Sequence, residues 1–321
     1  MKRNIVIIMA SLLITACAST PTGQIQAFGV AAADVTSKID TVITDYNQTN
    51  IDNQLAKMAQ RNKKYTASDL DPIKYILIRD ADKKSFALYQ ANNALGAYAS
   101  SLTELAAAGS REQMARASLK LNKSLKSMNK NYKIIKETSD DILSDENNAE
   151  ISRVIAEISS FYAENKRAKA LKKIIINSDN QIQLIGKIIN EQLLKSALES
   201  RIYTMRGTVL AGYFADYNKT TDKKSFASRK KSLDFIYRQY IEMQATGATI
   251  LQAQDAITSV MNAHAVMKSE LEKDQYTSKK IFKSIGEIVT VHKSYDDLEA
   301  LMVNCETEVI ADDKKGIICK D

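Results

Sequence analysis

The chain is poor in the residues that interrupt helices and in those that most often carry chemistry. Its 321 residues include no tryptophan, two prolines, ten glycines, three cysteines and two histidines. So few prolines exclude a proline-rich linker protein and argue against a β-sandwich, which needs many turns. So few histidines and cysteines provide few candidate ligands for a metal ion and few reactive thiols. The remaining composition, 45% apolar and 26% charged, favours long helices.

Catalytic motifs are missing as well. The sequence contains no G-x-S-x-G, H-E-x-x-H, P-loop or G-x-G-x-x-G pattern. Adjacent acidic residues such as Asp140 and Asp141 point apart on a helix, so they indicate a solvated helix end rather than an acid–base pair. We therefore predict that the protein is not an enzyme, and that it has no cofactor and no small-molecule substrate.

The N-terminus has the order of a secretory signal. Lys2 and Arg3 precede an apolar run at 5–14, which is too short to span a bilayer as a permanent helix. The next residues complete the tetrapeptide Ile14-Thr15-Ala16-Cys17, which resembles the lipobox of bacterial lipoproteins. The resemblance implies cleavage before Cys17 and acylation of that residue. Because no Asp follows Cys17, it also implies an outer-membrane protein that faces the periplasm or the cell surface. The alternative is an ordinary secretory signal with a chance cysteine.

The other two cysteines lie near the C-terminus. Cys305 and Cys319 are separated by 13 residues. In an oxidising compartment this even pair predicts a disulfide that closes residues 305–321 as a loop. Closure of such a loop contributes about 3 kcal/mol to stability in the loop-entropy description. The alternative is two free thiols.

Apolar residues recur at heptad-like spacing along most of the chain. The first stripe alternates steps of three and four residues and consists of Ile25, Phe28, Ala32, Val35, Ile39, Val42 and Tyr46. Similar stripes, with no strand pattern between them, predict about seven long helices whose polar breaks fall near 63–67, 109, 144–148, 177–179, 218–222 and 276. We expect an all-α fold, an elongated up-and-down bundle with coiled-coil-like packing. Its predicted divisions are a signal peptide 1–16, an acylated tether 17–22, a helical bundle 23–304 and the loop 305–321.

Two of the expected helices carry almost no charge. Phe86–Ala108 contains only Glu104, and Thr246–Met267 contains only Asp255. We interpret both as central helices of the bundle. The alternative is a membrane-active protein that releases such helices into a bilayer, although their Asn, Gln and Asp side chains are costly in hydrocarbon.

Lysine-rich segments form the clearest charged feature. They contain Arg116, Lys120, Lys123, Lys126 and Lys130 in one segment, and Lys166, Arg167, Lys169, Lys172 and Lys173 in the other. If the two segments form a hairpin about residue 145, position 123 faces about 167, and the acidic residues near 145 mark the opposite end. We hypothesise that the basic end lies beside the lipid anchor, together with residues near 22, 109, 178 and 275. In this hypothesis it rests on anionic lipid headgroups, and each lysine contributes up to about 1 kcal/mol to the binding. The alternative is a solvated surface. Nucleic acid is disfavoured because no aromatic residues are interleaved with the lysines.

One group of residues offers metal ligands. His264 and His292 lie on the core stripes of two consecutive helices, and Asp296 follows His292 by four residues, on the same face. Two imidazoles and a carboxylate suit a transition metal. We expect the alternative, two core histidines without a metal.

These features together predict a lipoprotein anchored in the outer membrane. We expect a non-enzymatic helical scaffold or binding module whose acidic far end contacts an envelope protein or polymer. A membrane-active protein of the pore-forming type is the alternative function.

Overall fold

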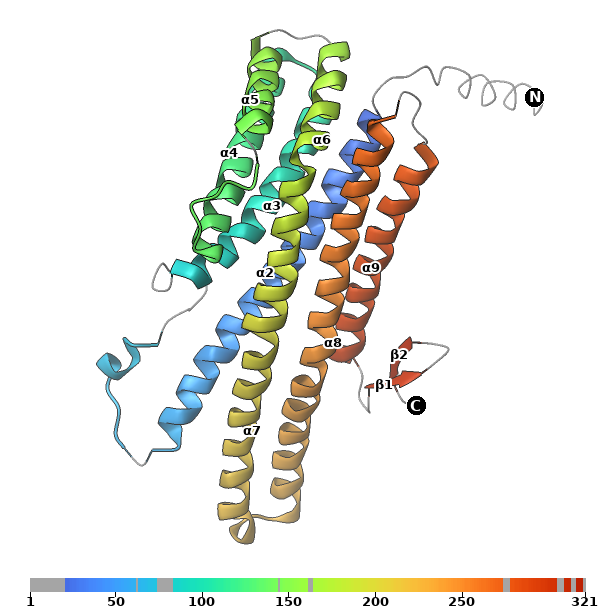
Figure 1. Ribbon diagram of the computed structural model, residues 1–321. Helices are drawn as coiled ribbons and strands as arrows, with labels where there is room; N and C mark the ends of the chain where they lie inside the picture. The colour runs from blue at the N-terminus through green and yellow to red at the C-terminus, as the bar shows by residue number, and fades with distance from the viewer. Residues whose placement is uncertain are drawn as a thin grey trace, which may run out of the picture.

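The computed structural model describes residues 21–61, 63–73, 83–143, 145–160, 164–273, 278–304, 309–312 and 316–319. Within these ranges the chain forms an elongated, all-α bundle, as the sequence predicts (Figure 1). Its α-helices are α2 (Thr22–Ala59), α3 (Lys83–Ala107), α4 (Arg111–Lys136), α5 (Asp145–Ser160), α6 (Glu164–Ile188), α7 (Ser200–Thr220), α8 (Phe226–Leu271) and α9 (Ser278–Asn304). Short 3₁₀ turns, Ala67–Leu70 and Thr221–Lys223, lie in the connections, and the π-helix Ile189–Glu199 joins α6 to α7.

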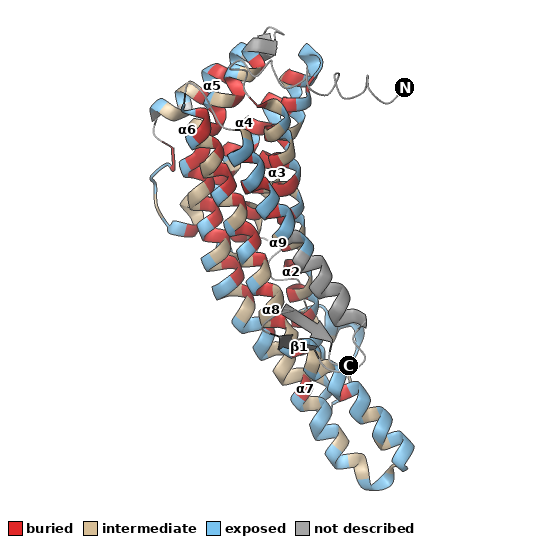
Figure 2. Cartoon of the chain, turned by 90° about the vertical axis from the view of Figure 1, so that its right-hand side faces the viewer, coloured by how far each residue is buried: buried red, intermediate tan, exposed pale blue. Residues whose placement is uncertain are grey.

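The predicted stripes form the core. All seven members of the first stripe, from Ile25 to Tyr46, are buried on α2. The stripe of α3 is buried as well, including Leu95, Tyr98 and Leu102. Because α2 packs along α3 and against α8 and α9, most of the apolar surface gathers in one body, which contains nearly all the buried residues in Figure 2. Both low-charge segments bury one face in this body, and Leu251 in the second segment is 57% exposed on the other face.

Small residues bring α2 and α3 close together. A Cβ atom at Gly29 would lie 2.6 Å from the backbone oxygen of Ala99 and 2.3 Å from the Oγ1 atom of Thr103. No side chain fits at this distance without a shift of the α3 backbone. Glycine at position 29 thus sets the separation of the two helices.

Capping interactions define where α4 begins and where the 3₁₀ turn before α3 begins. Ser110 caps α4, since its Oγ accepts a hydrogen bond from the backbone N–H of Gln113. From the sequence, Ser68 or Asp69 can cap a helix with Pro72 in its first turn, but residues 71–73 are not helical, so this prediction is wrong. Residues 67–70 form a 3₁₀ turn capped by Thr66, and the described part of α3 is Lys83–Ala107.

The predicted break at 177–179 is also wrong. α5 ends at Ser160 and α6 begins at Glu164, so the chain reverses between them, and α6 then passes through 177–179 as regular helix. The π-helix continues it into α7 without a turn. The polar side chains of Ser178 and Asp179 do not end a helix. They bind partners inside the body, as described below.

The C-terminal segment contains a β-hairpin that the sequence did not predict. β1 (Val309–Asp312) pairs antiparallel with β2 (Gly316–Cys319), and Val309 lies opposite Cys319. Cys305 lies outside the described residues, so its disulfide with Cys319 stays a prediction. Cys17 and the signal segment also lie outside the described residues.

Candidate functional site

A two-helix arm protrudes from the body. We use this name for residues 207–241, the ends of α7 and α8 that are joined by the 3₁₀ turn Thr221–Lys223. Figure 2 shows that the arm consists mostly of exposed and intermediate residues, in contrast to the body. α2 accompanies α7 only as far as the base of the arm, where Gln60 lies beside Gly212. The remainder of the arm is a helical hairpin without a third helix from the described chain.

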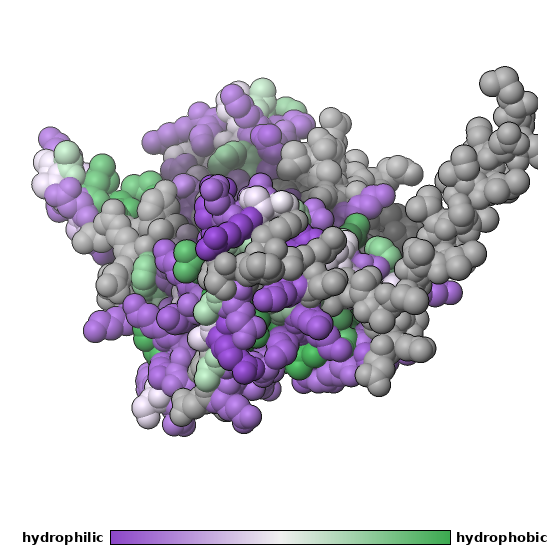
Figure 3. Space-filling model, turned by 90° about the horizontal axis from the view of Figure 1, so that it is seen from above, coloured by the Kyte–Doolittle hydropathy of each residue, from purple (hydrophilic) through white to green (hydrophobic). Residues whose placement is uncertain are grey.

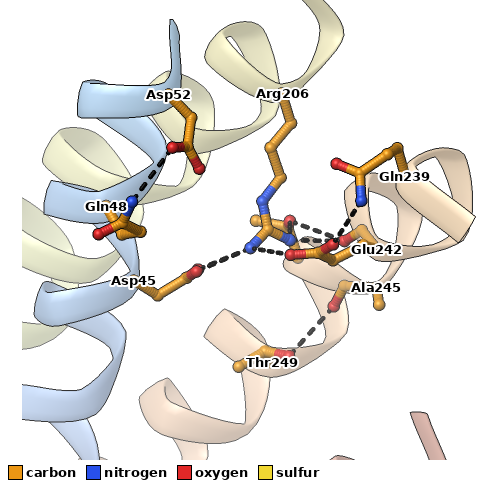
Figure 4. A network of polar contacts seen from close by, with 9 residues as sticks. Asp45, Gln48, Asp52, Arg206, Gln239, Glu242, Ala245 and Thr249 are labelled. Carbon is orange, nitrogen blue, oxygen red and sulfur yellow. Dashed lines mark hydrogen bonds and ion pairs between the residues drawn. The ribbon is translucent and has the colours of Figure 1, made fainter. Parts of the chain in front are cut away.

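Arg206 fixes the base of the arm (Figure 4). Its Nη2 atom lies 2.8 Å from Oδ1 of Asp45 on α2 and 3.1 Å from Oε1 of Glu242 on α8. Its Nη1 atom donates to the backbone oxygen of Glu242 at 2.7 Å and to Oγ1 of Thr246 at 2.9 Å. The guanidinium therefore links three helices through one planar group, a geometry that lysine cannot reproduce.

A small core of its own holds the arm together. Leu210, Ile236 and Met243 are buried between α7 and α8, with Tyr217 packed against them. Nearby, the rings of Tyr213 and Phe235 meet edge to face with their centroids 4.9 Å apart. These contacts keep the two helices paired beyond the end of α2.

The arm carries most of the exposed aromatic surface. Among the described residues eight aromatic side chains are exposed, and seven of them lie between positions 203 and 240; the seven are Tyr203, Tyr213, Phe214, Phe226, Phe235, Tyr237 and Tyr240. Phe226, at the start of α8, is 74% exposed. With Leu233, Tyr237 and Tyr240 it forms a series spaced by seven, four and three residues, which places these side chains on one face of α8. An exposed apolar patch of this kind marks an interaction site.

The tip of the arm is strongly basic. We call residues 219–231 the cationic turn, because this segment contains one acidic residue, Asp222, and six basic ones: Lys219, Lys223, Lys224, Arg229, Lys230 and Lys231. Nη1 of Arg229 donates to the backbone oxygen of Lys224, which fixes the start of α8 against the turn. Exposed aromatic and cationic side chains therefore occur together at the tip.

A second polar cluster lies in the centre of the body. Tyr98 on α3, Ser178 and Asp179 on α6, and His264 on α8 are all buried. The Tyr98 hydroxyl lies 2.8 Å from Oγ of Ser178 and 2.8 Å from Nε2 of His264, whose Nδ1 lies 2.8 Å from Oδ1 of Asp179. With a neutral imidazole, Nδ1–H donates to Asp179 and the tyrosine hydroxyl donates to Nε2. The chain of hydrogen bonds connects three helices.

Burial and hydrogen bonding shift the ionisation of this cluster. Burial raises the pKa of the Tyr98 hydroxyl well above its ordinary value. Burial tends to raise the pKa of Asp179, but its interactions with His264, Gln183 and Lys268 together outweigh burial, and the pKa of Asp179 lies below its ordinary value. Asp179 is therefore a carboxylate near neutral pH. Because all four side chains are buried, we interpret the cluster as an internal link of the body.

The predicted metal ligands are only partly described. Both ring nitrogens of His264 already have partners, Tyr98 and Asp179, so a metal would have to displace one of them. The side chains of His292 and Asp296 lie outside the described residues. Among the side chains that the structure does describe, no group of three His, Cys, Asp or Glu residues suits a metal ion.

The lysine-rich segments do not form the predicted hairpin. α6 runs parallel to α4, because Arg167 donates to the backbone oxygen of Ala108 near the start of α4 and Gln181 donates to that of Leu125 farther along. Position 123 therefore lies far from 167. Arg167 is buried, and Lys120 binds Glu104 at 2.6 Å. The other predicted basic residues are Arg116, Lys123, Lys126 and Lys130 on α4 and Lys166, Lys169, Lys172 and Lys173 on α6; Lys172 is partly buried and the others are exposed.

The expected acidic far end is also corrected. The connection between α4 and α5 lies beside the start of α3, where Glu137 contacts Lys84 at 3.5 Å, and Figure 1 places it well short of the tip of the arm. Two further acidic residues of this region have basic partners: Asp141 in the connection binds Lys133 at 2.8 Å, and Glu150 on α5 binds Lys173 at 3.1 Å. The end farthest from residue 22 is the basic tip of the arm.

The opposite end of the bundle is hydrophilic. Figure 3 views this end, where α2 begins, and its described surface is mainly hydrophilic. The start of α2 and the ends of α3 and α8 lie at this end, as predicted for the neighbourhoods of residues 22, 109 and 275, whereas Ser178 lies within α6 in the body. Lys273 and Lys280 lie here too, 2.5 Å and 3.7 Å from Oε1 of Glu270, so a single carboxylate offsets part of their charge.

Comparisons of the chain with models of protein families, with curated proteins and with solved structures each find no match. Of the helices that the structure describes, none is both long and apolar enough to cross a membrane. The features of the arm that indicate a function are its own exposed aromatic and basic side chains. It was not predicted from the sequence, although one signal was present: seven of the 21 aromatic residues of the chain lie within 213–240.

Proposed function

We propose that the protein is a lipid-anchored, non-enzymatic scaffold of the bacterial cell envelope, attached to the outer membrane through Cys17, and that the arm is its binding element. The observation that carries this proposal is the position of the exposed aromatic and basic side chains. They gather at the end of the bundle that is farthest from Thr22, where the described chain leaves the predicted anchor. The 46 residues of α8 extend over about 70 Å.

The body supports a scaffold role by its packing. Its helices bury their apolar faces against one another, and its buried polar side chains at positions 98, 178, 179 and 264 bind each other. Such a body holds the arm at a fixed distance and direction from residue 22. We expect the partner, an envelope protein, polymer or lipid surface, to contact the arm and not the body.

The test combines acyl labelling with crosslinking in cells. A fatty-acid label should enter the full chain and be lost in the Cys17→Ser variant. A photo-crosslinking residue at Tyr237 should yield a discrete adduct, and one at Leu119, an exposed residue on α4, should yield none. Failure of Cys17 to take up label would overturn the anchoring. Adducts of equal yield from both positions would overturn the arm as the binding element.

A membrane-active protein is the second candidate function, and the exposed aromatic residues of the arm favour it. A pore-forming protein would release dye from liposomes at low protein-to-lipid ratios, whereas a scaffold that docks on a surface leaves the liposomes sealed. We therefore expect binding without leakage. Leakage that is abolished by Phe226→Ser would favour the second candidate instead.

A further inference from the structure

The tip of the arm combines two kinds of side chain that a helical hairpin has no structural reason to expose together. Six basic residues lie within the 13 positions of the cationic turn, and Phe226 lies in the middle of them with 74% of its surface exposed. Behind the turn, Leu233, Tyr237 and Tyr240 continue the apolar face of α8 and are 41–46% exposed. Among the six basic residues, Lys230 has a carboxylate partner, since its Nζ atom lies 2.7 Å from Oδ2 of Asp234. The net charge of the turn is strongly positive.

Charge complementarity points to an anionic partner. Lysine and arginine are attracted to a surface of anionic lipid headgroups within about one Debye length, roughly 8–10 Å. Aromatic side chains are enriched where a protein meets the boundary between headgroups and hydrocarbon. Both side-chain types are present on the tip, and Phe226, the most exposed aromatic residue of the described chain, lies within the cationic turn itself.

Two other occupants fit the tip less well. A second copy of the chain that paired in parallel would bring two cationic turns together, which costs energy. Single-stranded nucleic acid binds in grooves that follow its backbone, with aromatic platforms along the groove. Phe226 and the cationic turn instead lie at the end of a two-helix hairpin, a position that an extended surface can reach.

We propose that the tip of the arm docks on a surface of anionic lipid, with the cationic turn on the phosphate groups and Phe226 inserted between the headgroups. This inference rests on the proposed function in so far as it names the partner of the arm. It makes the arm a second membrane contact, at the opposite end of the bundle from the acylated N-terminus.

The absence of tryptophan from the chain allows a direct test. The Phe226→Trp variant, made in the full chain with Cys17→Ser to prevent acylation, carries a single tryptophan at the tip. With vesicles of phosphatidylglycerol and phosphatidylcholine, its emission should shift to shorter wavelength and be quenched by brominated lipid. With vesicles of phosphatidylcholine alone, it should not change. Adding Lys223→Glu and Lys231→Glu should weaken the apparent affinity by about ten-fold or more.

Matched variants separate insertion of the tip from general adhesion. Leu119→Trp places tryptophan at a 64% exposed position on α4, among basic residues of the body, and should show neither shift nor quenching. In the Phe226→Trp chain, Lys123→Glu with Lys126→Glu removes the same charge from the body and should leave the affinity unchanged within about two-fold. Circular dichroism checks that each variant is helical.

Several results with the folded Phe226→Trp chain would overturn the inference. These are no shift of its emission on anionic vesicles, an equal shift on neutral vesicles, and a shift without lipid that grows with protein concentration, which would indicate a second copy. A larger response to a single-stranded oligonucleotide than to vesicles at equal phosphate would also overturn it. Because the purified chain lacks acylation, these results do not depend on the labelling and crosslinking that test the proposed function.

Discussion

α8 passes through two regions in which similar residues have opposite environments. In the body its residues Ile257, Val260 and His264 are completely buried, whereas in the arm Phe226 and Tyr237 are 74% and 46% exposed. The body places aromatic rings inside, as at Phe28, Tyr46 and Tyr98, and the arm places them outside. Aromatic burial stabilises a fold, and aromatic exposure at a cationic tip does not. The body therefore provides the stability of the fold, and the arm provides the contact surface.

The largest expected difference between the two regions is the loss of stability when a leucine is replaced by alanine. Leu102 in α3 is fully buried, and Leu233 in the arm is 41% exposed. We expect Leu102→Ala to lower the free energy of unfolding by about 3–5 kcal/mol, because it leaves a cavity in the body. Leu233→Ala should lower it by less than about 1 kcal/mol. Urea unfolding of both variants checks this, and equal losses would remove the distinction between the regions.

The buried cluster of the body gives the next effect. His264→Leu should cost about 3 kcal/mol, because it leaves Asp179 as a buried carboxylate without its imidazole partner and removes a partner of Tyr98. Urea unfolding at neutral pH measures the loss. Arm residues should keep their hydrogen exchange rates, and a loss below about 1 kcal/mol would show that the cluster contributes little.

The same cluster predicts how stability depends on pH. Since the folded pKa of Asp179 lies below its ordinary value of 3.8, its contribution is complete above about pH 4 to 5 and is lost as the pH falls through the folded pKa. The difference in unfolding free energy between the natural chain and Asp179→Asn should therefore shrink at acid pH. A difference that grows on acidification would contradict the direction of this pKa shift.

Two glycines sharpen the comparison. Gly29→Ala should destabilise the body by about 2 kcal/mol, because the new methyl group meets the backbone of Ala99. At Gly247, in α8 near the base of the arm, an added methyl group would meet no neighbouring atom within 4 Å, so Gly247→Ala should stabilise by about 0.5–1 kcal/mol. Thermal unfolding distinguishes the two signs. Two changes of the same sign would refute the packing described for α2 and α3.

A small and local effect is expected at the base of the arm. Arg206→Gln should cost about 1 kcal/mol, since Asp45 and Glu242 are about half exposed and regain water. The expected signature is local: amide exchange in the arm should accelerate while that of α3 and α4 stays constant. Arg206→Lys should restore only part of the protection. Uniform acceleration over the whole chain would show that Arg206 holds the body instead.

Heptad spacing predicted the helices. It also predicted which face of each helix is buried, wherever another helix packs against the apolar face. It failed at Ser178 and Asp179, because polar residues that bind Tyr98 and His264 inside the body resemble a break in the sequence. It also failed at α8, where the exposed Leu233 and Tyr240 belong to the same periodic pattern as the buried Ile236 and Met243. Periodicity shows which face of a helix is apolar, but it does not show whether another helix covers that face.

The basic and acidic segments illustrate the same limit. Counting charges along α4 and α6 located lysines correctly, but the predicted antiparallel pairing was wrong, since α5 intervenes and α6 runs parallel to α4. The cationic turn was visible in the sequence as six basic residues among 13 positions. Its position at the far end of the bundle follows only from the packing of α2, α7 and α8.

The most direct test of the division between body and arm is the unfolding free energy of the full chain with Phe226→Ser and Tyr237→Ser. If these residues serve contact and not stability, urea unfolding should give a value within about 1 kcal/mol of the natural chain. A loss of several kcal/mol would contradict the division, because it would show that the exposed aromatic residues of the arm are part of what holds the fold together.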